Sequence, residues 1–263
     1  MLVYTKKYGT LFIKMLILNI KGLRSYGTDF FIGVIGMAIK NISNIILLLF
    51  LYNLIPEING WNLYQMMYLY SISTISFSLW RCLFMNTLNI SYYVKYGKLD
   101  AFLTKPANPL FLIFMEGFDD DAWGDLLVGI ILNIYITICL DISLIFIPIV
   151  LILSFFTSLI FASTSIIGSI FSLKTVGIND FSDIPYMIYE FIKYPTSIYG
   201  KFVQIFFSTL LPISWISYIP ASSIIFSKNM LYIFFTIVFS ILYFTFAYII
   251  WNDYLKKYTS SGS

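Results

Sequence analysis

The stretch from Leu144 to Leu173 reads LIFIPIVLILSFFTSLIFASTSIIGSIFSL and contains no aspartate, glutamate, lysine or arginine. An α-helix rises ~1.5 Å per residue, so about 20 apolar residues cross the ~30 Å hydrocarbon core of a bilayer. Lipid cannot satisfy free backbone N–H and C=O groups, which leaves helices or a closed barrel, and barrel strands would alternate apolar and polar residues over ~10 positions. The stretch therefore predicts a transmembrane helix.

The rest of the chain has the same character. It is 263 residues long, 59% hydrophobic and 11% charged, against roughly 25% charged residues in globular proteins. Five further apolar segments are Phe30–Leu54, Trp61–Arg81, Trp123–Leu140, a segment that starts near Lys201 or upstream near Thr196, and Met230–Trp251. The sequence therefore predicts an all-α integral membrane protein with six transmembrane helices.

The segment after Lys201 is interrupted by prolines. Pro212 follows after about a dozen residues, too few to cross a bilayer unless the helix begins upstream or continues past the proline. Pro220 lies inside residues 212–226, which predicts a broken pair of short helices that re-enters the membrane before the last span. Such irregular backbone is tolerated only where protein or a water-filled cavity surrounds it.

The first 27 residues have an amphipathic pattern. Lys7, Lys14 and Lys21 recur every seven residues, so on a helix they drift only ~20° per step and form one basic stripe. This pattern predicts a helix over residues 1–27 that lies in the headgroup layer, with its lysines towards anionic lipid. A spanning helix is disfavoured, because a cation held at mid-depth costs ~2.5–3.5 kcal/mol.

The distribution of cations predicts the orientation, because cytoplasmic loops carry an excess of lysine and arginine. One side of the six predicted spans holds only Lys228. The other side holds Lys6, Lys7, Lys14, Lys21, Arg24, Arg81, Lys95, Lys98, Lys105, Lys174, Lys193, Lys201, Lys256 and Lys257. Both termini and two sizeable loops, residues 91–118 and 174–200, are therefore expected in the cytosol.

Motifs for catalysis are missing from the sequence. The chain has no histidine, no G-x-x-x-x-G-K-[ST] phosphate loop and no cysteine cluster with metal-ligand spacing. No basic patch within soluble structure indicates nucleic acid. We therefore expect a protein that is not an enzyme, that holds no metal or cofactor and binds no nucleic acid.

Four carboxylates form a dense group before the third predicted span: Asp119, Asp120, Asp121 and Asp125. Hard cations prefer oxygen ligands, so a metal site is conceivable. The group opens a helix, however, where carboxylates cap free N–H groups and meet the positive end of the helix dipole. A helix cap is the preferred interpretation.

Lys40 lies some ten residues into the first predicted span, close to Asn41 and Asn44. A cation at that depth is costly, which makes it a functional candidate. With Asn44 it would line a pathway and contact an anionic substrate or a lipid headgroup. Alternatively, it pairs with a carbonyl or a neighbouring subunit, or lies at a shallower depth. Arg81, at the end of its span, is expected to reach the interface.

The loop after the second predicted span contains a short amphipathic helix. Residues 96–110 read YGKLDAFLTKPANPL, in which Leu99, Phe102 and Leu103 fall at helical spacing between Gly97 and Pro106. An apolar face of this kind docks either on the chain's own membrane domain or the lipid surface, or on a partner protein.

Four strings, in this order, resemble the ABC-2-type transporter permease family, and within it a bacterial exporter-permease branch. They are YGKLD with LTKPANPL in residues 96–110, YPTSIYG in residues 194–200, LPISWISYIPA in residues 211–221, and LKKYTS in residues 255–260. The order of the predicted elements is also similar to that of the family, so the likeness covers nearly the whole chain.

The resemblance implies a permease subunit of an ATP-binding-cassette exporter in the bacterial cytoplasmic membrane, with residues 28–263 as the permease domain. Two copies of a separate ATPase subunit would hold ATP and Mg²⁺. A second, dissimilar permease would complete the pathway. Faces of the first, second and fifth spans would line it. Residues 180–194 would make a lesser ATPase contact, and Pro212 and Pro220 would belong to an extracellular gate. The main ATPase contact would be a coupling helix with Gly97, Lys98, Leu99, Asp100, Phe102, Leu103 and Lys105.

An ion-coupled secondary transporter or channel is the alternative. It would need acidic or histidine side chains at mid-membrane, and apart from Lys40 the predicted spans contain almost no charge.

Overall fold

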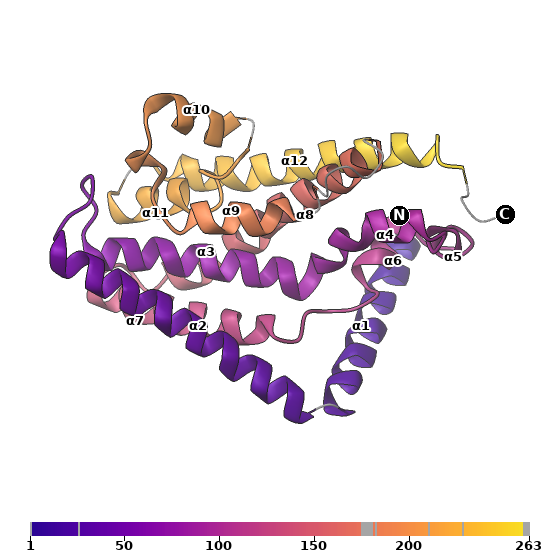
Figure 1. Ribbon diagram of the computed structural model, residues 1–263, viewed down its shortest axis with the longest axis horizontal. Helices are drawn as coiled ribbons and strands as arrows, with labels where there is room; N and C mark the ends of the chain where they lie inside the picture. Colours follow the sequence, from indigo (N-terminus) through magenta and orange to yellow (C-terminus); the bar gives the residue numbers. More distant parts are fainter. Residues whose placement is uncertain are drawn as a thin grey trace.

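The computed structural model describes residues 2–25, 27–174, 181, 183–209, 211–227 and 229–259, and the regular elements in these ranges are helices (Figure 1). Two of them are 3₁₀ turns, η1 (Met85–Asn89) and η2 (Thr196–Ile198). The α-helices are α1 (Leu2–Ser25), α2 (Gly27–Leu54), α3 (Leu63–Phe84), α4 (Ile90–Lys95), α5 (Leu99–Leu103), α6 (Pro109–Phe114), α7 (Ala122–Cys139), α8 (Phe146–Lys174), α9 (Ile184–Ile192), α10 (Lys201–Thr209), α11 (Tyr218–Ile225) and α12 (Leu231–Leu255).

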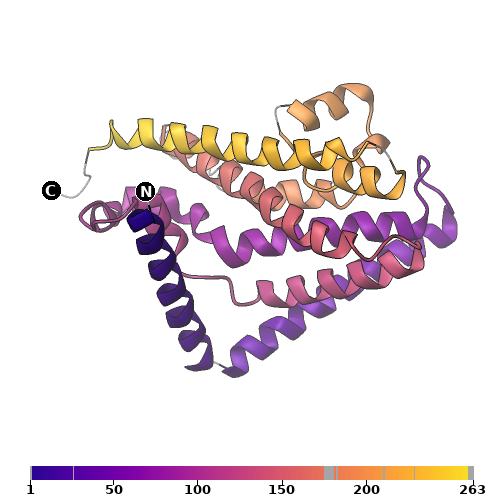
Figure 2. The same ribbon diagram turned by 180° about the vertical axis from the view of Figure 1, so that it is seen from behind.

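Four of the described helices are long and apolar enough to cross a membrane: α2, α7, α8 and α12. They correspond to the first, third, fourth and last predicted spans, with ends shifted by a few residues. The second predicted span is α3, whose 22 residues extend ~33 Å at ~1.5 Å per residue, although it is less apolar than those four. These five helices form the bundle, and Figure 2 shows α8 and α12 running side by side along one face.

The central helix is α3, which is buried around most of its circumference. Asn62 and Gln65 exchange side-chain hydrogen bonds with each other's backbone N–H at its start, which caps the helix. Its hydroxyls donate to its own carbonyls, as Ser76 does to Ile72 at 2.9 Å and Ser78 to Thr74 at 2.6 Å. Hydroxyls bonded in this way are satisfied without water, and their small size lets α7 and α8 pack closely.

The bundle has two distinct ends. One, here called the terminal end, holds α4, α5, α6 and the last turn of α12; the other, the turn end, holds residues 55–62 between α2 and α3 (Figure 1). Phe12 and Met15 of α1 pack against the same apolar cluster as Tyr254 and Leu255 of α12. The N-terminal helix and the end of the last helix therefore meet at the terminal end.

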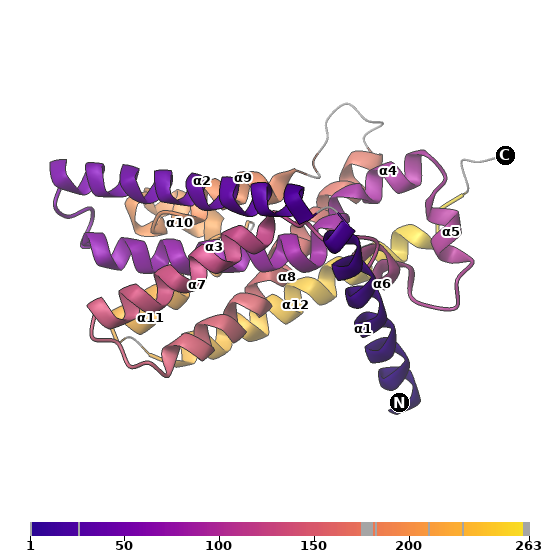
Figure 3. The ribbon, with the colours of Figure 1, turned by 90° about the horizontal axis from the view of Figure 1, so that it is seen from below.

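Within the first 27 residues the structure has one long helix, α1, over Leu2–Ser25, which runs across the bundle rather than along it (Figures 1 and 3). Lys14 and Lys21 of the predicted basic stripe are exposed. On the opposite side, the ring of Tyr8 packs edge-on against Phe111 of α6 at 5.0 Å, and its hydroxyl accepts a hydrogen bond from the Asn108 N–H at 3.0 Å. A helix held across one end of a bundle has the orientation of an interfacial helix.

Residues 91–118 do not form a free loop. They contribute α4, α5 and α6, whose apolar residues join one core cluster with α8 and α12. Gly97, with a φ of +67°, makes the turn between α4 and α5 that a residue with a Cβ would adopt only under strain. As a result, α5 lies at the tip of the terminal end (Figure 3).

The predicted fifth span, starting near Lys201, is wrong as a single long helix. The helix there, α10, has nine residues, about 14 Å at ~1.5 Å per residue, too short to cross a bilayer. Gly200 before it and Pro212 after it limit its length. The chain instead passes along the bundle before it reaches α10, through α9 and η2.

This passage overturns the expectation that residues 174–200 form a cytosolic loop. At the terminal end, the Phe181 N–H donates to Ser172 of α8 at 2.7 Å, and at the turn end the Asn59 side chain donates to the Ser197 carbonyl. Between them, Tyr189 of α9 is buried against α3. Residues 175–180 and 182, including Asp180 of the predicted second ATPase contact, lie outside the described residues.

The pair of short helices predicted within residues 212–226 is not found there. Residues 212–226 contain one helix, α11, and the other short helix of this region, α10, ends before Pro212 and lies beside the turn end in Figure 1. Ser217 donates to the Ile192 carbonyl at 2.7 Å, which ties the start of α11 to the end of α9. Pro212 is buried in the connection, and Pro220 lies in the first turn of α11, where its missing N–H breaks no helical hydrogen bond.

Candidate functional site

Arg81 of α3 is buried and binds two carboxylates. Its Nη1 lies 2.6 Å from Asp125 Oδ2, while its Nε and Nη2 lie 2.6 and 2.5 Å from Asp119 Oδ2. The exposed fractions of the side chains are 7% for Arg81, 0% for Asp125 and 11% for Asp119. A guanidinium that donates to both carboxylates forms strong, directional ion pairs.

Lys40 of α2 binds the same oxygen of Asp125 as Arg81 does. Its Nζ lies 3.3 Å from Asp125 Oδ2, and 42% of its side chain is exposed. Asn41, one residue further, is fully buried and donates to Asp125 Oδ1. Lys40, Arg81, Asp119 and Asp125, here called the charge cluster, contain two cations and two carboxylates, so their formal charges cancel. Mutual pairing is what makes charges tolerable in an apolar interior.

A chain of polar side chains continues from the charge cluster along α2 and α3. The Tyr70 hydroxyl donates to Asn41 Oδ1 at 2.7 Å, and Asn44 donates to the Tyr70 hydroxyl at 3.2 Å. Each polar group on this path therefore has a partner inside the protein. Asn44, predicted as a pathway residue, is the end of this chain nearest the turn end.

Two expectations are corrected here. The acidic group acts as a helix cap only in part: Asp119 Oδ1 accepts a hydrogen bond from the Asp121 N–H at 3.1 Å, but the side chain of Asp121 makes no capping hydrogen bond, and Asp119 and Asp125 also bind Arg81. Arg81 does not extend to the membrane interface as expected, because its guanidinium is buried in the bundle in an ion pair with Asp125. In the described ranges, no three histidine, cysteine, aspartate or glutamate side chains are grouped so as to hold a metal ion.

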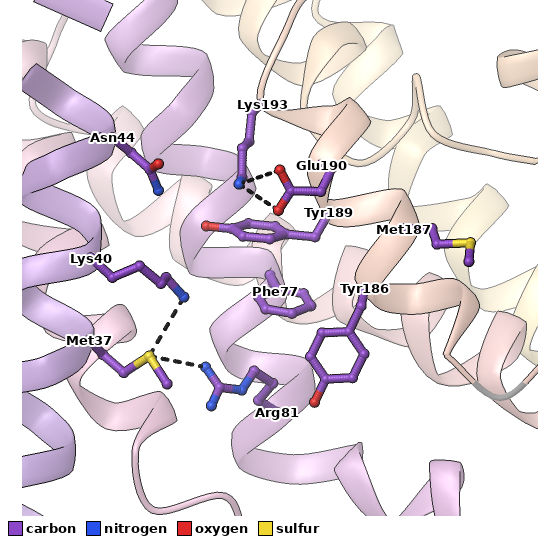
Figure 4. A pocket seen from close by; sticks show the side chains of 10 residues that line it. All are labelled: Met37, Lys40, Asn44, Phe77, Arg81, Tyr186, Met187, Tyr189, Glu190 and Lys193. Atoms are coloured by element: carbon purple, nitrogen blue, oxygen red, sulfur yellow. Dashed lines mark hydrogen bonds and ion pairs between the residues drawn. The ribbon is translucent and has the colours of Figure 1, made fainter. Parts of the chain in front are cut away.

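A pocket of about 600 Å³ opens beside the charge cluster. Three helices line it: α2 with Met37, Lys40 and Asn44; α3 with Phe77 and Arg81; and α9 with Tyr186, Met187, Tyr189, Glu190 and, directly after its last residue, Lys193 (Figure 4). The structure thus brings Lys40 and Asn44 together on one wall, as the sequence suggested. The opposite wall comes from residues that the sequence had placed in a cytosolic loop.

The α9 wall carries its own ion pair and a stack of rings. Lys193 Nζ lies 2.7 and 2.9 Å from the two carboxylate oxygens of Glu190. The Tyr189 ring stacks on the Phe77 ring, with 4.0 Å between the ring centres. Lys193 Nζ lies 4.4 Å from the centre of the Tyr189 ring (Figure 4). A cation over an aromatic face is attracted by the ring quadrupole. Glu190 and Lys193 are three residues apart in the sequence, a spacing typical of an ion pair on a helix, but the sequence did not indicate that this pair lies in a pocket.

The predicted coupling residues lie together around α5, but they differ in how far they are exposed. Leu99 and Phe102 are buried in the chain's own core, beside α4 and α6. Lys98, Leu103 and Lys105 are exposed, whereas Gly97 and Asp100 are intermediate. The apolar face predicted from Leu99, Phe102 and Leu103 is therefore mainly an internal contact, and the surface available to a partner is the opposite one.

Comparison with known families identifies the chain. The family described as "ABC-2 family transporter protein" matches residues 38–262, which include every element from α3 to α12 and most of α2. No curated protein and no solved structure matches the chain. The matched residues contain the charge cluster, α5 and every residue that lines the pocket except Met37. The chain belongs to the ABC-2 transporter family and is a multi-pass membrane permease of an ABC transporter.

Proposed function

We propose that this permease is the membrane subunit of an exporter driven by two copies of a separate ATPase, which bind ATP and Mg²⁺. The observation that supports this most strongly is the position of α5 in a chain of this family. It lies at the tip of the terminal end, beyond α1 (Figures 1 and 3). If α1 lies in the headgroup layer, α5 projects past that layer into the cytosol, where an ATPase subunit can reach it.

The ATPase contact consists of the exposed residues around α5. Lys98, Leu103 and Lys105 supply the contact, with Ala101 and Thr104 between them. Gly97, Leu99, Asp100 and Phe102 support this surface from behind, because burial of Leu99 and Phe102 fixes α5 to the bundle. Such a rigid connection would transmit movement of the ATPase to α3 and α8 instead of being absorbed by a flexible loop.

The translocation pathway lies on the open side of the pocket, between this chain and a second, dissimilar permease. The exposed face of α2 supports this arrangement, since it presents large apolar side chains along its whole length, among them Ile35, Ile39, Ile46 and Phe50. Lipid alone would also satisfy these side chains. The charged pocket beside them, however, needs a water-filled or protein environment.

Both termini face the cytosol of a bacterium in this arrangement, and the turn end faces outward. The pair α10 and α11, with Pro212 and Pro220, then forms an outer gate, held to α9 by Ser217. The alternative of an ion-coupled carrier is less well supported, because Asp125, the buried carboxylate, is already paired with two cations.

Purification of the tagged chain from its native membranes tests the proposal. We expect a nucleotide-binding subunit and a second permease to co-purify in stoichiometric amounts, and the complex to hydrolyse ATP. Recovery of a folded chain without a nucleotide-binding subunit, from membranes solubilised in several mild detergents, would contradict it.

A further inference from the structure

We propose that the pocket between α2, α3 and α9 binds an amphipathic anion, a ligand with a phosphate-like group on an apolar body, and that Lys40 holds the anionic group. The proposal rests on the function proposed above and names the class of substrate that the pathway accepts.

The positive charges of the site face the pocket, and most of the negative charges lie behind its wall. Lys40, Arg81 and Lys193 line the pocket, against one carboxylate, Glu190. Asp125 and Asp119, which balance Arg81 and Lys40, do not line it, and they are 0% and 11% exposed. The cations and the carboxylates are equal in number, but the cations lie nearer to an approaching ligand, and in surroundings of low dielectric constant this favours an anion.

Lys40 is the member of the charge cluster that can change partner. Its contacts are an ion pair of 3.3 Å to Asp125, a contact of 3.6 Å to the weakly accepting sulfur of Met37 and a cation–π contact of 5.9 Å to the centre of the Tyr189 ring, although an ammonium group donates three hydrogen bonds. If Lys40 turns to a ligand, Asp125 keeps Arg81 at 2.6 Å and the amide of Asn41. When Lys40 binds an anion, Asp125 therefore keeps one cationic partner, Arg81, which it shares with Asp119.

The remaining walls suit an apolar body. Phe77, Tyr186 and Tyr189 present rings, and Met37 and Met187 present flexible thioethers that adapt to irregular shapes. The volume of about 600 Å³ lies within the range of roughly 300–1,000 Å³ typical of small-molecule sites. At the rim, 65% of Met187 is exposed, so the pocket is open to the surroundings of α9. A bilayer lipid and a soluble amphiphile share this chemistry.

Ligand titration on the full chain in nanodiscs of phosphatidylcholine tests the proposal. The probes are dodecyl phosphate, dodecyltrimethylammonium and inorganic phosphate. We expect saturable binding of dodecyl phosphate, at least tenfold weaker in Lys40→Met, a loss of ~1.4 kcal/mol, and within threefold of the original in Lys40→Arg. Lys95→Met, at an exposed lysine of α4 outside the pocket, is the matched control and should change nothing. Melting temperatures verify that each variant is folded.

Three results would overturn the proposal: an unchanged Kd in folded Lys40→Met, equal binding of the cationic amphiphile, or equal binding of inorganic phosphate and dodecyl phosphate. Native mass spectrometry of the chain from its own membranes then distinguishes the sources. Anionic phospholipid retained by the original chain and lost in Lys40→Met indicates a bilayer ligand, and its absence from both indicates a soluble one. The titration needs no ATPase, so its failure and the failure of the proposed function are separate results.

Discussion

Replacement of Asp125 by alanine is expected to destabilise the protein by about 3–5 kcal/mol, the effect of breaking a buried ion pair from one side. Asp125 accepts hydrogen bonds from Arg81, Lys40 and Asn41 and is fully buried. Without it, two cations are left with one carboxylate, Asp119. The change is measured as the free energy of unfolding in mixed detergent micelles, or as a large fall in the melting temperature.

Two further variants separate charge from packing in this prediction. Asp120→Ala removes an exposed carboxylate from the same acidic group and should change stability by no more than ~0.5 kcal/mol. Asp125→Asn keeps the size of the side chain but not its charge, and should still cost several kcal/mol. If Asp125→Asn proved as mild as Asp120→Ala, the ion pairs would not be what stabilises this junction of α2, α3 and α7.

The second large effect concerns α5, where two leucines four residues apart should behave differently. Leu99→Asp places a charge in the core, since Leu99 is 0% exposed, and it should prevent folding. Leu103→Asp places the same charge on a surface where 43% of the side chain is exposed, so the chain should fold with its melting temperature little changed. The ATPase should nevertheless be lost from the complex, at least tenfold by quantitative co-purification.

Thr104→Asp places the same charge on the same contact surface without removing an apolar side chain, because Thr104 is exposed and already polar. It should retain more of the ATPase than Leu103→Asp does. Normal ATPase recovery with folded Leu103→Asp would mean that the partner binds elsewhere at the terminal end.

The positions of most long helices could be predicted because each coincides with a long apolar segment that contains few charged residues. The four long apolar helices were located to within a few residues, since in lipid a run of about 20 apolar residues has few structures available. α3 was located by the same rule even though serines and threonines reduce its hydropathy. Its hydroxyls bond to its own backbone, so they do not argue against a span.

The path of the chain between Lys174 and Met230 was not predictable by this rule. Residues 184–192 read IPYMIYEFI, which is apolar but too short to resemble a span, yet α9 packs against α3 and α8. Its burial depends on contacts such as Tyr189 with Phe77, which are tertiary and leave no periodic signal. The sequence therefore predicts the fifth span after Lys201, whereas in the structure α9 and η2 make this pass along the bundle.

The candidate site was predicted in part. Lys40 and Asn44 were singled out because a cation within an apolar run is costly, and they do line the pocket. The roles of Arg81 and Asp125 were missed, because each lies at the end of its own segment, where snorkelling and helix capping are the ordinary explanations. Their pairing depends on how deeply α3 and α7 overlap, which no single segment reveals.

Photo-crosslinking from α5 to the ATPase tests the central claim most directly. A benzoylphenylalanine is placed at position 103 or, as a control, at the exposed position 57 at the opposite end of the bundle, in cells that produce the whole complex. We predict a crosslinked product between permease and nucleotide-binding subunit from position 103 and none from position 57. No product from position 103, or equal products from both positions, would contradict the assignment of α5 as the coupling contact.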